Sequence, residues 1–321
     1  MNRRVAALIK RHPMVTSTAA TMLRLSTRTY IRNAPWMFGK RRAYELYSRH
    51  LVGSRGHKTR VRTRYGDVME LATSDLVAST IYRTGHWEPI ITRYICRHLK
   101  PGDTFIDCGA NIGYYSLIAS RIVGRDGTVF SIEASERIYR DMLTNLELNR
   151  CVNVKPIHAA AAGEEGELSM FLAHESNLGH STTVSSLADK EGMAFETKVH
   201  ADTLEELVGP ANLRNARMIK LDVEGAERTV LAPLFDSLDR FSARTEWLIE
   251  LIPSFCAGGQ DDVNAIFHAF RNAGYTAYHI PNDYDAGFIL SPPPAPDLVP
   301  LEKSPCEQCD VLMSRSAEVR F

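Results

Sequence analysis

Residues able to bind a nucleoside follow a short apolar run that ends at Asp107. Gly109 and Gly113 are four residues apart with Asn111 between them, and a helical pattern begins directly afterwards. A strand, a glycine turn and a helix in this order place a nucleotide-like ligand outside the carboxyl end of the strand. A dinucleotide-binding turn has glycines at offsets 0, 2 and 5, and the second and third of these are absent here. The turn therefore predicts a site for a nucleoside without a pyrophosphate, of which S-adenosylmethionine is the commonest.

A second acid supports this prediction. Glu133 closes the apolar run 128–133, twenty residues after Gly113. In doubly wound folds, a carboxylate about 20 residues beyond the glycine turn holds the ribose hydroxyls. Asp107 and Glu133 could instead accept hydrogen bonds from loop amides without touching a ligand. The spacing of the turn and the acid together favours ligand binding.

Charged residues interrupt the strand that is predicted over 218–222. Strands buried on both faces are almost entirely apolar, yet this one contains Lys220 and Asp222, which project from the same face. A buried lysine is costly unless it is paired, so we expect Lys220 to contact Asp222, Glu224 or Glu250. A structural ion pair at the rim of the sheet would give the same pattern. Acids that end successive strands meet at the carboxyl edge, which favours an active-site role.

Apolar runs alternate with helical patterns over most of the chain. The seven predicted strands are 104–107, 128–133, 152–157, 218–222, 247–252, 276–280 and 310–313, and the predicted helices include 136–149, 226–235 and 261–271. This alternation predicts an α/β, doubly wound fold, with a mostly parallel sheet covered by helices on both faces. We assign 73–321 to the main domain, with a polar insertion or lid at 163–200. We assign 1–72 to a basic N-terminal extension that is helical first and then forms a hairpin over 58–72.

The net charge of zero conceals a steep asymmetry. Residues 1–64 contain 16 Lys or Arg and one acid, Glu45, whereas the rest of the chain has a net charge of −15. Three interpretations stay open: the basic segment contacts an anionic membrane, it is an organelle presequence, or it packs on the acidic domain. Nucleic acid is not an expected partner, because the segment contains no recognisable nucleic-acid-binding module.

Sequence features also bear on the compartment. No uncharged run exceeds 13 residues, which is short of the roughly 18 to 20 that a membrane span requires. Lys10 and Arg11 interrupt the apolar residues that a secretory signal would need. We therefore expect a cytoplasmic protein, with peripheral membrane attachment or an organelle presequence as alternatives. Cys306 and Cys309 form a lone C-x-x-C pair, so reduced thiols are expected rather than a four-ligand zinc site.

Five short motifs carry a resemblance to a known family. They are DCGANIG (107–113), IEA (132–134), LELN (146–149), DTL (202–204) and IKLDVEGAE (219–227). Together they resemble the FkbM-type family of S-adenosylmethionine-dependent methyltransferases, over about 85–315. The resemblance implies a seven-stranded class I methyltransferase fold of the Rossmann-like type. It also implies methyl transfer to a hydroxyl oxygen of a sugar, glycolipid or secondary metabolite.

The resemblance also implies positions for the cofactor. The methionine part would lie among Asp107, Gly109, Ala110, Asn111 and Gly113. Glu133, followed by Ala134, would hold the ribose, and Ala159–Ala160 would border the adenine.

Transfer to an alcohol requires an aligned acceptor and a base that takes its proton. We expect Asp222 to be this base, with Glu224 as second choice, Lys220 fixing their position and charge, and His180 as a further candidate. Clustered acids could instead hold Mg²⁺, but they show no distinctive spacing and we assign no metal ligands. Methylation of RNA or protein is an alternative, and so is a non-catalytic adaptor that binds a partner through 1–64. The oligomeric state stays open.

Overall fold

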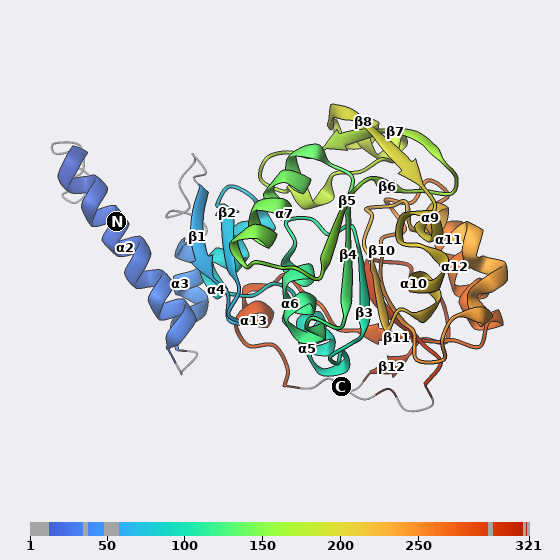
Figure 1. Ribbon diagram of the computed structural model, residues 1–321. Coiled ribbons are helices and arrows are strands. Elements are labelled where there is room, and N and C mark those ends of the chain that lie inside the picture. The colour runs from blue at the N-terminus through green and yellow to red at the C-terminus, as the bar shows by residue number, and fades with distance from the viewer. Residues whose placement is uncertain (1–12, 35–37, 48–57, 295–297, 317–318, 320–321) are drawn as a thin grey trace.

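One central sheet contains all seven predicted strands (Figure 1). The computed structural model describes residues 13–34, 38–47, 58–294, 298–316 and 319. The predicted strands are β3 (Thr104–Cys108), β4 (Thr128–Glu133), β5 (Val154–His158), β9 (Met218–Leu221), β10 (Glu246–Leu251), β11 (Thr276–Ile280) and β13 (Cys309–Ser314). An eighth strand, β12 (Val299–Pro300), completes the order β12-β11-β13-β10-β9-β3-β4-β5.

Most of the strands run in one direction. β5, β4, β3, β9 and β10 are parallel neighbours, whereas β13 lies antiparallel between β10 and β11. Without β13 and β12, the order is that of a doubly wound sheet, in which the first strand lies beside the second and the fourth. The predicted α/β class and mostly parallel sheet are therefore confirmed. The predicted number of strands is one too low, because the two residues of β12 are too few to show an alternating pattern.

Helices cover both faces of the sheet. Neighbouring residues of β3 point to opposite faces, so Phe105 and Ile106 enter different apolar clusters. The first cluster packs α4 (Leu76–Thr84), α5 (Pro89–His98), α6 (Tyr114–Val123), α7 (Glu136–Leu148) and α13 (Ala286–Leu290). The second packs α9 (Leu204–Val208), α10 (Pro210–Asn215), α11 (Glu227–Leu231), η3 (Ala232–Arg240) and α12 (Gln260–Asn272). Each face of the sheet thus has its own apolar core.

The helix predicted over 136–149 shows how local sequence sets an element. The hydroxyl of Ser135 accepts a hydrogen bond from Ile138 N (3.2 Å) and caps the start of α7. Ile138, Met142 and Leu146 are buried toward the sheet, as their spacing predicts. The helix therefore begins and faces inward for reasons that are present in the sequence.

Much of the described part of the basic segment packs on the rest of the molecule. It forms α2 (Pro13–Asn33), α3 (Lys40–Leu46) and a hairpin of β1 (Lys58–Arg62) and β2 (Val68–Ala72), which Figure 1 shows on the α7 side of the sheet. Ile31 is fully buried in the first apolar cluster. Asn149 and Asn145 bind the backbone amides of Val68 and Glu70, at 2.8 and 2.7 Å. The end of α2, α3 and β1 thus pack on the rest of the molecule, whereas Figure 1 shows the start of α2 projecting away from it. All three interpretations of the basic segment stay predictions.

The predicted insertion lies at the carboxyl end of the sheet. It contains β7 (Gly166–Leu172), η2 (Leu178–His180), α8 (Ser185–Glu191) and β8 (Ala194–Asp202), and β8 pairs with β7 and with β6 (Ala160–Ala161). The boundary at residue 72 and the role of 163–200 as a lid stay predictions. In the part of the chain described here, no helix combines the length and the apolar character that crossing a membrane requires.

Candidate active site

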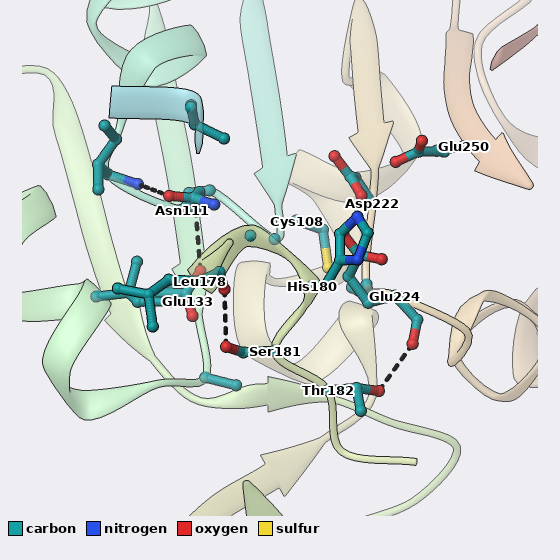
Figure 2. Close-up of a pocket in the computed structure, with 18 of the residues that line it drawn as sticks. Cys108, Asn111, Glu133, Leu178, His180, Ser181, Thr182, Asp222, Glu224 and Glu250 are labelled. Carbon is teal, nitrogen blue, oxygen red and sulfur yellow. Dashed lines mark hydrogen bonds between the residues drawn. The ribbon is translucent and has the colours of Figure 1, made fainter. Parts of the chain in front are cut away.

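A cavity of about 290 Å³ lies at the carboxyl ends of β3, β4 and β9. Figure 2 shows its wall, with the turn after β3, the end of β4, the η2 loop, the acids after β9 and Glu250 of β10 around one space. Ten of the predicted residues line it: Gly109, Ala110, Asn111, Glu133, Ala134, Ala160, His180, Lys220, Asp222 and Glu224. The topology therefore brings the predicted cofactor turn and the predicted catalytic acids into one cavity.

The glycine turn is shaped by a close approach of two chains. Gly109 has φ +82°, and a Cβ there would lie 1.8 Å from the backbone oxygen of Asp222. Only glycine fits this position, because it lacks a Cβ and accepts positive φ. Asp222 N donates to Cys108 O (3.0 Å), so the ends of β3 and β9 are in direct contact. The turn and the charged strand thus form one rigid corner of the cavity.

Glu133 is held at the cavity by backbone amides. Its carboxylate accepts hydrogen bonds from Asn111 N (2.9 Å) and Ser135 N (2.8 Å). Asn111 itself has φ +50°, a left-handed conformation that asparagine tolerates better than most residues. Burial raises the pKa of Glu133 to about 7, although the amides favour its charged form. Glu133, which is predicted to hold the ribose, therefore lies beside the predicted cofactor turn.

Two predicted cofactor residues do not reach the cavity. Asp107 is fully buried and accepts a hydrogen bond from Ser116 Oγ (2.6 Å). Burial raises its pKa to about 6, against the nearby charge of Lys220. Gly113 precedes α6, and a Cβ there would lie 3.0 Å from the side chain of Met142. Neither residue lines the cavity in this geometry, because the Asp107 side chain is buried against Ser116 and Gly113 faces α7. That both surround the cofactor stays a prediction.

The buried lysine has the expected partner. Lys220 Nζ lies 2.6 Å from Asp222 Oδ2, and 5% of Lys220 is exposed. Burial alone would lower the pKa of Lys220, but Asp222, Glu88 and Asp107 together raise it above the ordinary value. Burial alone would raise the pKa of Asp222, but the charge of Lys220 outweighs it and lowers that pKa. The pair is therefore an ammonium and a carboxylate at neutral pH.

Further acids surround this pair. Burial and the charge of Asp222 raise the pKa values of Glu224 and Glu250 well above their ordinary range. Glu250 accepts a hydrogen bond from Gln308 (2.6 Å), while Glu224 Oε2 is buried without a partner among the described residues. Carboxylate oxygens of Asp222, Glu224 and Glu250 lie within 4.8 Å of one another, a spacing that could hold a metal ion. Lys220 neutralises one of these three acids, Asp222.

His180 lies on the η2 loop beside these acids (Figure 2). Its ring packs edge-on against Phe255, with 5.4 Å between the ring centroids. Burial lowers its pKa, although the charge of Asp222 acts in the opposite direction. The imidazole is therefore neutral at neutral pH and close to the predicted base.

The cavity wall around Glu88 was not predicted from the sequence. Glu88 lines it, is 6% exposed, and accepts hydrogen bonds from Tyr115 OH and Tyr284 OH, the latter at 2.8 Å. Trp87 stacks on Tyr284 with 5.3 Å between the ring centroids. The signal in the sequence is weak: an acid that precedes Pro89, the first residue of a helix. These residues add an aromatic and acidic wall opposite the glycine turn.

The chain is similar to known methyltransferases. Residues 107–277, slightly more than half of the chain, match the family model of the methyltransferase FkbM domain. The protein therefore belongs to the FkbM methyltransferase family. Methyltransferase 1 of Beauveria bassiana (strain ARSEF 2860) is 27% identical over 152 residues, which cover 42% of this chain and 60% of that protein.

Solved structures of other methyltransferases are distant. An S-adenosylmethionine-dependent O-methyltransferase from Thermotoga maritima shares 14% identity, with 87% of this chain and 83% of that chain covered and a TM-score of 0.39. A precorrin-6y methyltransferase from Geobacter metallireducens GS-15 shares 12% identity over 70% of this chain and 86% of that chain, with a TM-score of 0.37. Similarity at this level says nothing about the substrate of this protein.

Proposed function

We propose that the protein transfers the methyl group of S-adenosylmethionine to a hydroxyl oxygen of a sugar, a glycolipid or a secondary metabolite. The observation that carries this proposal is the direct contact between the glycine turn and the charged strand at Gly109 and Asp222. It places a nucleoside-type turn and a carboxylate with a charged partner in the same cavity. Membership of the FkbM methyltransferase family supports it.

The cavity wall fits the proposed cofactor. Ala134, Ala159 and Ala160 have small apolar side chains, which leave room for a flat base ring. Glu133 ends the adjacent strand with its carboxylate held by two amides, a position suited to ribose hydroxyls. When bound, S-adenosylmethionine supplies a methyl group on a sulfonium, which is a good leaving group.

The residues of the chain then have to align the acceptor and take its proton. An alcohol is a poor nucleophile while it is protonated, so a base near the acceptor oxygen accelerates the transfer. Asp222 is this base in our proposal, because Lys220 keeps it ionised and in place. Glu224 is the second choice, and His180, whose ring lies beside these acids in Figure 2, is a further candidate.

The test is incubation of purified protein with methyl-labelled S-adenosylmethionine and fractionated cell extract. Label is expected in glycolipid or in small polar molecules, and Asp222→Asn is expected to lower the rate by about 10²-fold or more. Asp126→Asn, at an exposed loop carboxylate, is the matched control and should keep full activity. Label in RNA or protein alone would replace the proposed substrate class. Cofactor binding without any labelled product would favour a non-catalytic adaptor.

We further propose that the protein works in the cytoplasm. All six cysteines are free, as is usual in a reducing compartment. Thiol titration of the denatured protein, isolated from cells with its thiols blocked, should therefore find six reduced cysteines. A native disulfide in protein isolated from cells would contradict this location.

A further inference from the structure

A second cavity, of about 380 Å³, lies between the basic helix α2 and the hairpin. Arg28, Thr29, Arg32 and Asn33 line it from α2, and Arg62, Thr63 and Arg64 line it from the end of β1. We call it the arginine pocket. It belongs to the basic segment and shares no lining residue with the candidate active site, and the proposed methyl transfer does not use it.

The four arginines of this pocket have no acidic partner. Among the described residues, none of them forms an ion pair with a carboxylate. The nearby sequence offers few acids: residues 1–44 and 46–66 contain no Asp or Glu, and Asp67, which comes next, acts electrostatically on Arg62. Among the described residues, Arg28, Arg32 and Arg64 thus share one cavity without a carboxylate partner.

Backbone carbonyls hold all four of these side chains in place, that of Arg62 through Gly66 O (2.5 Å). Arg28 Nε donates to Tyr82 O (2.9 Å), with its guanidinium 4.3 Å from the centre of the Tyr82 ring. Arg32 Nη2 donates to Arg62 O (2.6 Å), and Arg64 Nε donates to Thr84 O (2.8 Å). Each guanidinium has five N–H groups, so donors remain after these bonds are made. The pocket is preorganised, which lowers the entropy cost of binding a ligand.

A buried hydroxyl in the same pocket also lacks a partner. Thr63 is 6% exposed, and its Oγ1 has no hydrogen-bond partner among the described residues. Buried polar groups are normally satisfied, and an exception points to a missing ligand or water. Burial and the charges of Arg28 and Arg64 also lower the pKa of Arg32 to about 10. An anion in the pocket would give Thr63 Oγ1 a hydrogen-bond partner and would offset the repulsion that lowers the pKa of Arg32.

We propose that the arginine pocket binds a phosphate group. Planar guanidinium groups bind phosphate oxygens in pairs, through short charge-assisted hydrogen bonds. The hydroxyl of Thr63 would add a neutral donor, as threonine does in many phosphate sites. The phosphate could belong to an anionic lipid headgroup or to a soluble phosphorylated molecule, since both present the same oxygens.

Two binding measurements on the full-length protein test this proposal and separate the two sources. Calorimetry with glycerol 3-phosphate reports soluble phosphate, and flotation with phosphatidylcholine vesicles, with and without phosphatidic acid, reports the lipid headgroup. The double variant Arg32→Gln with Arg64→Gln is expected to bind about tenfold more weakly or worse in the assay that detects binding. Thr63→Val keeps charge and shape, and should lose affinity several-fold.

The matched control removes the same charge elsewhere. Arg125→Gln with Arg240→Gln replaces two exposed arginines elsewhere, one in a turn and one at the end of η3, and it should bind like the wild type. Equal losses in both double variants would show general charge attraction and overturn the proposal. Absence of binding to both probes by the wild type would also overturn it. If Arg32→Gln with Arg64→Gln does not fold, as judged by thermal melting, then unchanged affinity in Thr63→Val decides against the pocket.

Discussion

The pair of Lys220 and Asp222 is the residue-scale feature on which the proposed chemistry depends. Lys220 is buried and Asp222 is partly exposed to the cavity, so removing the lysine leaves a carboxylate with no charge partner at a poorly solvated wall. Breaking a buried pair on one side costs more than removing both partners, because the remaining charge is unpaired. The pair therefore contributes both position and charge to the site.

Replacement of this lysine gives the first prediction. Lys220→Met should lower the free energy of unfolding by about 2–3 kcal/mol at pH 7, because the Asp222 carboxylate loses its partner. The pKa of Asp222 should rise, so the acidic limb of a kcat/KM profile should move to higher pH. In the wild type, where that pKa is lowered, the contribution of Asp222 to stability is present above about pH 4 and is lost as the pH falls further. Lys220→Met with Asp222→Asn should recover part of the stability; no recovery would mean that the two charges do not stabilise each other.

A second buried acid, Glu227, should lower the stability of the protein as the pH rises, whereas Asp222 raises it. Burial raises its pKa from 4.5 to about 7, although the backbone amides of Val223 and Gly225 bind one of its oxygens. A carboxyl group whose pKa is higher in the folded state destabilises the protein as the pH rises from 4.5 through 7. Glu227→Gln should therefore raise the free energy of unfolding by about 2 kcal/mol at pH 8 and hardly at all at pH 5. Urea unfolding at both pH values checks this, with the exposed Glu165→Gln as the control; an equal gain at pH 5 would rule out the titration.

At the scale of elements, one carboxylate connects a helix to the cavity. Asp75 caps α4 through Ala78 N (2.9 Å), and its other oxygen accepts from Leu178 N (2.9 Å) at the start of the η2 loop. Leu178 and His180 line the candidate active site. The position of the η2 loop over the cavity therefore depends on the start of α4.

The third prediction removes this connection. Asp75→Ala should weaken the binding of S-adenosylhomocysteine about tenfold, because the η2 loop loses a charge-assisted hydrogen bond. Thr203→Ala removes a comparable cap at the start of α9 and should cost about 1 kcal/mol of stability without changing the affinity. Calorimetry and thermal melting of both variants measure the two effects. Equal affinities in the two variants would show that the η2 loop does not depend on Asp75.

How much could be predicted from the sequence also depends on the element. The strands, the capped helix after Ser135 and the pairing of Lys220 with a nearby acid follow from local patterns, and the structure confirms them. The sequence leaves Asp222, Glu224 and Glu250 open as the partner, and the structure shows Asp222. The wall around Glu88 does not, because its partners Tyr115 and Tyr284 lie 27 and 196 residues away in the chain. Asp107 was assigned to the cavity because it ends an apolar run, but its side chain turns into the sheet toward Ser116. Local patterns thus identify helices and strands, whereas the direction in which a side chain at the end of a strand points depends on tertiary packing.

At the scale of the whole molecule, the sheet depends on a strand from the C-terminal region. β13 pairs with both β10 and β11, and Val311, Leu312 and Met313 are at most 1% exposed. Without β13, these two neighbours would present unpaired edges and apolar side chains to water. Exposed edges of this kind promote aggregation.

Truncation gives the fourth prediction. A chain that ends at Lys303 should be insoluble on expression, because β13 is missing from the middle of the sheet. A chain that ends at Ser316 keeps β13 and should remain soluble, with a melting temperature close to that of the full chain. Sedimentation of the lysates and thermal melting of the soluble fraction distinguish the two. A soluble, cooperatively melting chain that ends at Lys303 would contradict the prediction.

The place of β13 also has a consequence for biosynthesis. The ribosome makes β10 and β11 before β13, the strand that separates them, so β11 cannot join the sheet until β13 has been synthesised. The nascent chain can assemble β3, β4, β5 and β9 earlier, but β11 waits for β13. During that interval, chaperones have a defined pair of strands to protect.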